Sequence, residues 1–478
     1  MYYTLNEPWA LRGYRGQLLC LDPAGLPDRP RPLSQALFSL LGRCDGQTPL
    51  TDLTETERQA LALLEAQGII RFSPSPDPWQ PWQDYRFHDN RRILSAAWGI
   101  TGRCNARCRH CFMASDTAGT PEEFSWDACR RLIAEMADCG IRRVMLTGGE
   151  PLLHPDFFPI VREIRDQGMA VSRIYTNAFR LTEETLDRLE EAGQRPEMMI
   201  SFDGVGVHDW MRNVPGAEKM ALKAIILCRE RGLRVRVSMN LNAVTLPAAM
   251  PTLEKMAELG ADTLFFIRTT QTPKWLDQGK NTLTDDEYLE TQLRLIRHLR
   301  ELRTGQTRLR FFNGLEIGPE TTGADLDQPF QRWLSDEVPD SAWCGKCTES
   351  FFVASDGRVL PCDAFEGGTL AGGFLMTDNN VHTRPLRDIL NDSEYSRMMT
   401  LRVEDMLAHN PACQACAWSR VCRGGACRAC GIAALAVRAG SYRGLDPAEG
   451  ILTPDPVLCR FFRGGYFDRL KALLEETG

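Results

Sequence analysis

Strand-like and helix-like hydrophobic patterns alternate through the middle of the chain. From about residue 93, short apolar runs of strand length recur at intervals of roughly 30 to 50 residues. Amphipathic runs such as Trp126–Cys139 and Glu183–Ala192 lie between them. This alternation predicts a parallel sheet covered by helices. The expected strands are Leu94–Ile100, Arg142–Thr147, Val171–Thr176, Met198–Asp203, Arg234–Asn240 and Asp262–Arg268.

Six strand–helix units are too few to close an eight-stranded barrel. The predicted fold class is therefore α/β, with an open partial (β/α)6 barrel at residues 93–313. In complete barrels the functional side chains gather at the carboxyl ends of the strands. We expect the same arrangement here.

The chain before the barrel has the order of a winged-helix module, at residues 1–72. The proline-rich segment SPSPDPWQPWQD at 73–84 excludes helix and central strand, so residues 73–92 are predicted to be a linker. The strand-like and helix-like pieces of the module are Tyr2–Leu5, Trp9–Arg12, Gln17–Asp22, Leu33–Leu41, Thr54–Gln67 and Ile69–Phe72.

After Asn313 the alternation stops. Residues 314–478 are rich in Cys, Gly and Pro until a closing helix near Tyr466–Glu476. So little apolar periodicity cannot build a large core, and bound metal clusters would supply the missing stability.

Composition narrows the function classes. The 478 residues are 43% hydrophobic, and 56 basic against 63 acidic side chains give a net charge of -7. The basic residues are dispersed, so nucleic acid is not an expected partner. No apolar run is long enough to span a membrane, and the first residues lack the order of a signal peptide. We expect a cytoplasmic protein with no membrane partner.

The 17 cysteines are the most informative feature of the composition. Thiols clustered at short spacing in a reducing compartment favour metal or iron–sulfur ligation over disulfides. Five cysteines are isolated and fit buried small hydrophobic positions: Cys20, Cys44, Cys129, Cys139 and Cys228. The clustered ones are Cys104, Cys108 and Cys111; Cys344, Cys347 and Cys362; and Cys413, Cys416, Cys422, Cys427 and Cys430, with Cys459 beyond.

The first cluster of thiols lies just after the first barrel strand, in TGRCNARCRHCF. Three thiolates on one loop would leave one iron of a four-iron cluster without a protein ligand, and an open iron can bind a small molecule. The alternative is a structural zinc site with His110 as fourth ligand. Structural zinc sites are closed four-ligand shells, which this spacing fits poorly.

This spacing, with Phe112 beside the last cysteine, resembles the radical S-adenosylmethionine (radical SAM) superfamily. The resemblance covers the whole barrel, because the second strand ends in GGEP, residues 148–151. It implies a [4Fe–4S] cluster that cleaves S-adenosylmethionine to a 5′-deoxyadenosyl radical. Capping of strand ends is the structural alternative for Asn177, Ser201 and Asp203. The cofactor-binding residues that the resemblance implies are Phe112, Gly148, Gly149, Glu150, Asn177, Ser201, Asp203, Arg212 and Asn240, with Arg212 pairing the methionine carboxylate.

The later cysteines resemble the SPASM extension of peptide-modifying radical SAM enzymes, at residues 314–478. The resemblance implies two auxiliary [4Fe–4S] clusters, three clusters in all. The spacing after Cys422 is one residue longer than usual, so Cys427 and Cys430 both remain candidates for the fourth ligand of the first auxiliary cluster. A zinc ribbon is the alternative for Cys413 and Cys416 taken alone. The implied sets are Cys344, Cys347, Cys362 and Cys427 or Cys430, and Cys413, Cys416, Cys422 and Cys459.

The N-terminal module resembles the PqqD-like domains that bind the leader of a ribosomally made precursor peptide. The resemblance implies that the leader pairs with Gln17–Leu21 as an added strand and packs against the helix Thr56–Leu64. A generic winged helix that binds nucleic acid is the alternative. The net acidic helix argues against phosphate contact.

Together these resemblances imply a radical SAM/SPASM maturase that cross-links a precursor peptide through a thioether or carbon–carbon bond. An external electron donor such as flavodoxin or ferredoxin is an expected partner. One alternative is a sulfatase-maturing enzyme that forms formylglycine, in which Asp363, directly after Cys362, would be the catalytic base. Other peptide oxidation or epimerisation is also open. The alternative outside enzymes is an iron–sulfur or zinc scaffold, which would leave GGEP and Arg212 without a purpose.

Overall fold

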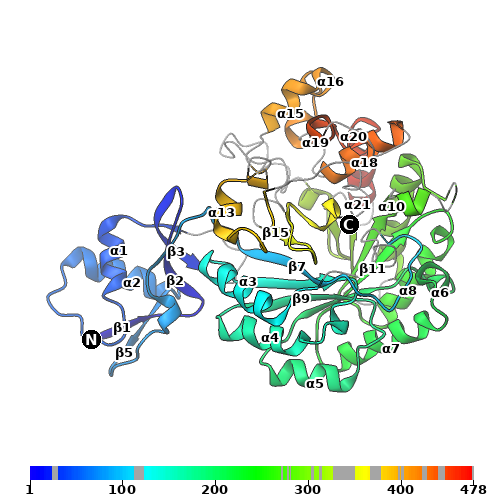
Figure 1. Cartoon of the computed structure of the whole chain (residues 1–478). Helices are drawn as coiled ribbons and strands as arrows, with labels where there is room; N and C mark the ends of the chain where they lie inside the picture. The colour runs from blue at the N-terminus through cyan, green and yellow to red at the C-terminus, as the bar shows by residue number, and fades with distance from the viewer. Residues whose placement is uncertain are drawn as a thin grey trace.

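The computed structural model places a large α/β domain between a small N-terminal module and a set of short C-terminal helices (Figure 1). The residues that it describes are 1–23, 31–111, 123–270, 273–276, 279, 281–302, 306–311, 315–326, 350–366, 378–393, 395–396, 399, 403–422, 428–439 and 447–475.

Six consecutive parallel strands form the centre of the sheet, in chain order. Each begins and ends within two residues of the predicted strand. The strand sides facing the helices carry fully buried residues such as Trp98, Val144 and Leu146. The predicted α/β partial barrel is confirmed. The six strands are β7 (Ser95–Thr101), β8 (Arg143–Gly148), β9 (Ala170–Thr176), β10 (Glu197–Ser201), β11 (Val235–Leu241) and β12 (Thr263–Arg268).

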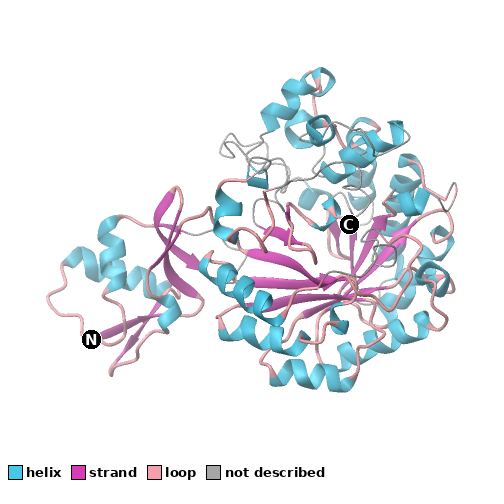
Figure 2. Ribbon diagram, viewed as in Figure 1, coloured by secondary structure: helices cyan, strands magenta, loops and turns pink. Residues whose placement is uncertain are grey.

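Helices cover the outer face of this sheet (Figure 2). Their apolar stripes recur at helical spacing, as in α4, where Phe157, Ile160, Val161 and Ile164 are buried. The helices after the strands are α3 (Trp126–Asp138), α4 (Phe157–Asp166), α5 (Glu183–Glu191), α6 (His208–Arg212), α7 (Ala217–Glu230), α8 (Ala249–Glu258), α9 (Pro273–Leu276) and α10 (Asp285–Leu302), with 3₁₀ turns η2 (Pro151–Leu153) and η3 (Leu246–Ala248).

The sheet is wider than the sequence pattern predicts. At one edge β13 (Arg308–Phe311) lies parallel to β12, followed by antiparallel β14 (Glu316–Ile317). At the other edge β15 (Ser350–Val353) lies parallel to β7, followed by antiparallel β16 (Val359–Leu360). The Cys-rich region therefore contributes buried strands to the main core, which the prediction for residues 314–478 missed.

Short helices form the rest of that region. The predicted closing helix is present as α21, and α20 and α21 pack on α10 through Arg460 with Asp286 and Arg469 with Glu290. These elements are η4 (Asp363–Phe365), α13 (Leu386–Asn391), α15 (Val403–His409), α16 (Pro411–Gln414), α17 (Ser419–Cys422), α18 (Arg428–Ala439), α19 (Pro447–Leu452), α20 (Pro456–Arg463) and α21 (Tyr466–Glu475).

The N-terminal module contains the predicted strands and helices, arranged as two small sheets. One sheet pairs β1 with β5, and the other has the order β4-β3-β2-β6. A capping box at Thr54 and Glu57 starts the second helix. The elements are β1 (Tyr2–Leu5), β2 (Trp9–Tyr14), β3 (Gln17–Pro23), β4 (Arg31–Pro32), α1 (Gln35–Gly42), α2 (Glu55–Ala66), β5 (Ile70–Ser73), η1 (Pro81–Gln83) and β6 (Arg86–His88).

The prediction of a linker at 73–92 is wrong for its second half. Strand β6 pairs in parallel with β2, so this segment completes the module's sheet. The buried side chain of Gln83 donates to the carbonyls of Leu5 and Trp9. The buried guanidinium of Arg12 donates to the carbonyls of Trp82 and Asp84. The module therefore extends to about residue 88.

The prediction that Gln17–Leu21 is a free sheet edge is wrong for Leu19–Leu21. Strand β4 pairs with Cys20 and Leu21, and the N–H of Leu33 donates to the carbonyl of Leu19. With β2 on its other side, β3 is an inner strand there. Among the described residues, β4 is the outer strand on this side of the sheet.

The module is fixed to the barrel by polar contacts. Asp22 is buried and pairs with Arg92 at 2.9 Å. His88 Nδ1 lies 2.7 Å from the carbonyl oxygen of Asp138, at the end of α3. None of the helices in the described ranges has both the length and the apolar character needed to cross a membrane.

Candidate functional site

The three predicted cluster cysteines lie on the loop that follows β7. None of the three is in a disulfide; Cys108 is buried, and Cys104 and Cys111 are half-buried. The amide of Ala106 donates to Cys104 Sγ at 3.4 Å. Burial raises the pKa of Cys104 to about 12, so the metal-free site holds a thiol there. Cluster binding would therefore release protons.

The GGEP segment after β8 lies directly against this loop. The amide of Gly149 donates to the carbonyl of Thr101, and the amide of Glu150 donates to that of Arg103, both at 2.7 Å. A Cβ at Gly149 would lie 2.2 Å from the carbonyl oxygen of Arg103. Gly148 has a φ of 142°, and a Cβ there would lie 2.3 Å from the oxygen of Thr101. Only glycines allow this approach.

Glu150 joins the second strand end to the third. Its fully buried carboxylate accepts hydrogen bonds from the N–H of Asn177 and the hydroxyl of Thr176, both at 2.8 Å. Burial raises the pKa of Glu150 to about 7, although these hydrogen bonds act in the opposite direction. The Asn177 side chain in turn reaches the loop, donating to Asn105 Oδ1 at 2.7 Å and lying 3.7 Å from Cys104 Sγ. Predicted residues from three strand ends therefore meet here.

Arg212 approaches the same loop from α6. It is buried, and its Nη1 lies 3.5 Å from Cys108 Sγ. Its Nε lies 2.7 Å from Oδ2 of Asp203. Although burial alone would raise the pKa of Asp203, the charge of Arg212 lowers it to about 2. The pair is therefore ionised at neutral pH.

The side chain of Asp203, a predicted cofactor contact, is 0% exposed, and its contact with the cofactor stays a prediction. Its Oδ1 accepts from the backbone and side-chain N–H groups of Asn240, at 3.1 and 3.2 Å. It holds Arg212 and Asn240 in place. Asn240 and Ser201 are half-buried at the ends of β11 and β10, so their predicted contacts stay predictions.

His110, the alternative zinc ligand, faces a different partner. It is buried, and its Nε2 lies 3.1 Å from Nδ2 of Asn240. Within the described ranges, no three His, Cys, Asp or Glu side chains converge as ligands of one metal ion. Three cysteines on one loop, none in a disulfide, are instead the soft donor set that iron–sulfur clusters take. The residues present fit such a cluster. Phe112 lies outside the described residues.

The auxiliary cysteines are described in part. Cys413, Cys416, Cys422 and Cys459 are in no disulfide and are half-buried on or beside α16, α17 and α20. Trp418, between α16 and α17, packs on Phe462 of α20 with ring centres 5.2 Å apart, which brings the implied second set into one region. Cys344, Cys347, Cys427 and the side chain of Cys430 lie outside the described part of the chain.

Cys362 is free and half-buried after β16, and Asp363 begins η4. Leu360 of β16 pairs with Phe352 of antiparallel β15, so the chain runs from there toward Ser350 at the start of β15. Ser350 pairs with Ser95 at the start of β7, which places Cys362 near that end of β7. The Cys104 loop follows the other end of β7. The role of Asp363 as a base stays a prediction.

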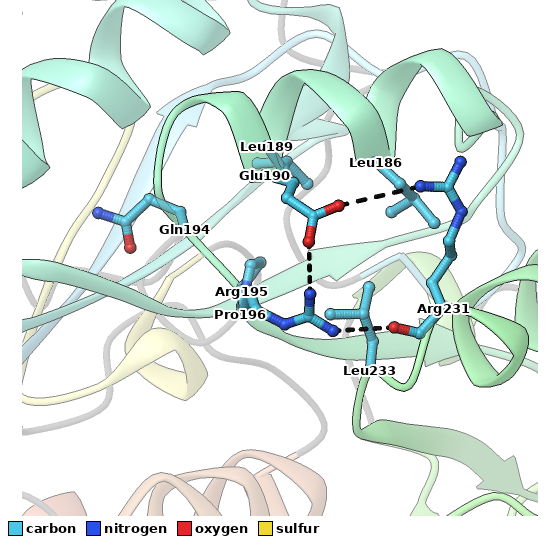
Figure 3. Close-up of a pocket in the computed structure, with 8 residues that line it drawn as sticks. All are labelled: Leu186, Leu189, Glu190, Gln194, Arg195, Pro196, Arg231 and Leu233. Carbon is cyan, nitrogen blue, oxygen red and sulfur yellow. Dashed lines mark hydrogen bonds and ion pairs between the residues drawn. The ribbon is translucent and has the colours of Figure 1, made fainter.

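A small pocket at the amino ends of β10 and β11 is not part of this site (Figure 3). Glu190 holds its rim through Arg195 and Arg231. Its volume of about 20 Å³ has room for one water molecule and no substrate.

Comparison with known families agrees with this geometry. Residues 98–267 match the radical SAM superfamily, and residues 344–417 match the iron–sulfur cluster-binding SPASM domain. The chain contains a radical SAM domain and a SPASM domain. These domains indicate binding of [4Fe–4S] clusters and S-adenosylmethionine.

Related proteins fall into two groups by name. The AdoMet-dependent heme synthase of Methanosarcina barkeri is 28% identical over 70% of this chain and 90% of its own length. The subtilosin biosynthesis protein AlbA of Bacillus subtilis is 29% identical over 68% of this chain and 67% of its own length. Among solved structures, Streptococcus suis SuiB bound to its precursor peptide SuiA matches with a TM-score of 0.60 and 14% identity, over 92% of this chain and 98% of SuiB.

The radical SAM domain also contains residues that sequence reasoning missed. Thr176 and Asn105 complete the network around Glu150 and Asn177. Thr176 is the last residue of a strand and Asn105 follows a cluster cysteine, and these positions in the sequence could have pointed to them. In the SPASM region Glu366 is buried, and burial raises its pKa to about 8. A buried acid four residues after Cys362 is a candidate functional group that the sequence alone did not single out.

Proposed function

We propose that this protein is a peptide-modifying radical SAM enzyme. Hydrogen abstraction by a 5′-deoxyadenosyl radical would install a thioether or carbon–carbon cross-link in a ribosomally made precursor. An external donor such as flavodoxin or ferredoxin would supply electrons. In this proposal, Cys104, Cys108 and Cys111 hold the [4Fe–4S] cluster that supplies the radical chemistry, and the chain's other residues orient the cofactor and exclude water.

The N-terminal module carries the proposal. Residues 1–88 make up about 18% of the chain, whereas the likeness to SuiB leaves out only 8% of it. Most of the module is therefore part of that shared fold. The solved SuiB structure contains a precursor peptide, which supports a peptide substrate for this chain.

The surface of the module supports a binding role as well. Most of the exposed large apolar side chains of the described chain lie within residues 1–88. Concentration of such residues on one module is typical of an interaction site. They are Met1, Leu18, Leu63, Phe72, Tyr85 and Phe87.

We place the leader along β4 and α2, and no longer on β3. Arg31 of β4 donates to the side chain of Gln67 at the end of α2, so the two elements are neighbours. Leu63 on α2 is 60% exposed. A peptide lying beside β4 would gain apolar contact with α2, whereas Pro32 has no N–H to donate to an added strand.

Two variants separate the two docking positions. Leu63→Ser should weaken binding of a labelled leader peptide, because it removes apolar contact on α2. Leu18→Ser is the matched control, since Leu18 is 66% exposed on β3, whose carbonyl at that residue already accepts from the Tyr85 hydroxyl. Loss of binding in the Leu18 variant alone would return the leader to β3.

The similarity to the heme synthase favours a second candidate, the synthesis of heme from a tetrapyrrole. One experiment separates the two functions. Anaerobically reconstituted enzyme is incubated with S-adenosylmethionine and reductant, and either a peptide encoded by a short open reading frame beside this gene or iron coproporphyrin.

Peptide processing would appear as loss of two hydrogen atoms, and it should fall steeply in a protein lacking residues 1–88 because tethering of the core is lost. Conversion of the porphyrin to heme, unaffected by that deletion, would overturn the peptide proposal.

A further inference from the structure

The ion pair of Asp203 and Arg212 has a fixed direction relative to the Cys108 thiol. Nε of Arg212 lies 2.7 Å from Oδ2 of Asp203, and Nη1 of the same guanidinium lies 3.5 Å from Sγ of Cys108. The cation therefore stands between the carboxylate and the sulfur. Its side chain is only 8% exposed, so solvent screens its charge weakly.

Buried groups hold this pair in position. Oδ1 of Asp203 accepts from the backbone and side chain of Asn240, and the amide of Asp203 donates to Nδ1 of His208 at 2.8 Å. His208 is uncharged, because burial lowers its pKa to about 3. The pair is therefore held rigidly by neutral neighbours, and the guanidinium has little freedom to leave the sulfur.

We propose that the Asp203–Arg212 pair tunes the reduction potential of the cluster held by Cys104, Cys108 and Cys111, an inference that rests on the proposed function. Reduction adds one electron to a cluster whose thiolates are already negative. A cation and a hydrogen bond at a ligand sulfur stabilise the reduced form, and so raise the potential. Asp203 is a positioning residue that anchors the cation and partly offsets its charge.

This arrangement predicts shifts of opposite sign. Arg212→Met removes the cation and leaves the acid behind it, so the potential should fall. Asp203→Asn keeps the shape and leaves the cation uncompensated, so the potential should rise. If Arg212 and Asp203 only supported the loop, replacing either side chain would shift the potential in the same direction or leave it unchanged.

The test is an anaerobic redox titration of the reconstituted full chain, followed by electron paramagnetic resonance, without S-adenosylmethionine. Omitting the cofactor separates this role from any pairing of Arg212 with the methionine carboxylate. The signal of this cluster is isolated by subtracting that of a Cys104→Ala, Cys108→Ala, Cys111→Ala protein. Arg212→Lys, which keeps the charge, should stay closer to the native potential than Arg212→Met.

Glu197→Gln is the control variant, because Glu197 also pairs with arginines on this sheet, Arg173 and Arg236, at the amino ends of the strands. The reduction potential of the cluster in the Glu197→Gln protein should equal that in the native protein. Iron content and circular dichroism establish that each variant folds and carries its cluster. Equal potentials in all variants, or shifts of the same sign for Arg212→Met and Asp203→Asn, would overturn the inference. If the native protein forms no cluster on these cysteines, the proposed function fails instead.

Discussion

The buried carboxylate of Glu150 accepts a hydrogen bond from the backbone N–H of Asn177, 2.8 Å away. This bond joins the GGEP segment to the exit of the next strand. Because Asn177 also reaches Asn105 and Cys104, one acid connects the ends of β8 and β9 to the cysteine loop that follows β7. The geometry of the candidate site therefore depends on a carboxylate that has no access to water.

The burial of Glu150 should make stability depend on pH. Its pKa is about 7 in the folded protein, against 4.5 for a free side chain. Below 4.5 both states are protonated, and between these values only the unfolded state releases the proton. Stability should therefore fall as pH rises through this window, by about 3 kcal/mol in total at roughly 1.4 kcal/mol per pKa unit.

Urea unfolding of the protein before cluster reconstitution measures this loss. Glu150→Gln cannot ionise, so its stability should lack this downward slope even though it loses hydrogen bonds at every pH. Parallel profiles for the two proteins would contradict the assignment.

Gly149 should tolerate no side chain. A Cβ would lie 2.2 Å from the Arg103 carbonyl oxygen, so Gly149→Ala must push the GGEP segment away from the cysteine loop. We expect loss of S-adenosylmethionine binding, measured by equilibrium dialysis of the reconstituted enzyme. Gly42→Ala is the control, since nothing lies within 4 Å of its added Cβ. Native affinity in Gly149→Ala would show that the two segments do not need this approach.

Removal of the three loop cysteines should separate the clusters. The triple change of Cys104, Cys108 and Cys111 to Ala should abolish cleavage of S-adenosylmethionine and lower bound iron by about a third, because each set of ligands is separate in sequence. Cys228→Ala, a buried thiol in α7, should keep both properties. Iron and sulfide analysis with chromatography of 5′-deoxyadenosine decides the outcome. Stoichiometric zinc in the triple variant would point to a zinc site among the later cysteines.

The barrel strands could be predicted because each buried strand is a local apolar run between polar turns. Strands β4, β6 and β15 could not, for physical reasons that differ. Strand β4 is Arg-Pro and β6 is Arg-Phe-His, and both exist only because a distant strand supplies their hydrogen bonds. Strand β15 is apolar but short, and it joins an edge of the sheet made more than 200 residues earlier.

The residues of the site were predictable, but some of their roles were not. The resemblance to the radical SAM superfamily located Glu150, Asn177 and Arg212 near the cysteines. Sequence position alone could not tell that Asp203 has no exposed surface, because its burial depends on the packing of His208 and Arg212 from α6 against it. The sequence therefore located these residues but not the contacts that hold them in place.

Arg12 tests the corrected extent of the N-terminal module. Its buried guanidinium donates to the carbonyls of Leu11, Trp82 and Asp84, and it stays charged because burial lowers its pKa only to about 10. Arg12→Met should cost roughly 2 to 4 kcal/mol, since one buried and two partly buried carbonyls would lose a charged donor. Proteolysis should then cut within residues 73–88, which a free linker would allow in the native protein too.

Arg15→Met is the matched control for Arg12→Met. Arg15 lies just beyond the same strand but is exposed, and its ion pair with Asp89 spans 3.4 Å. Exposed pairs of this kind contribute less than about 1 kcal/mol, so this variant should resist protease as the native protein does. Equal cleavage of native protein and both variants would mean that residues 73–88 are a free linker. Protection lost only in Arg12→Met would show that this segment is held as part of the module.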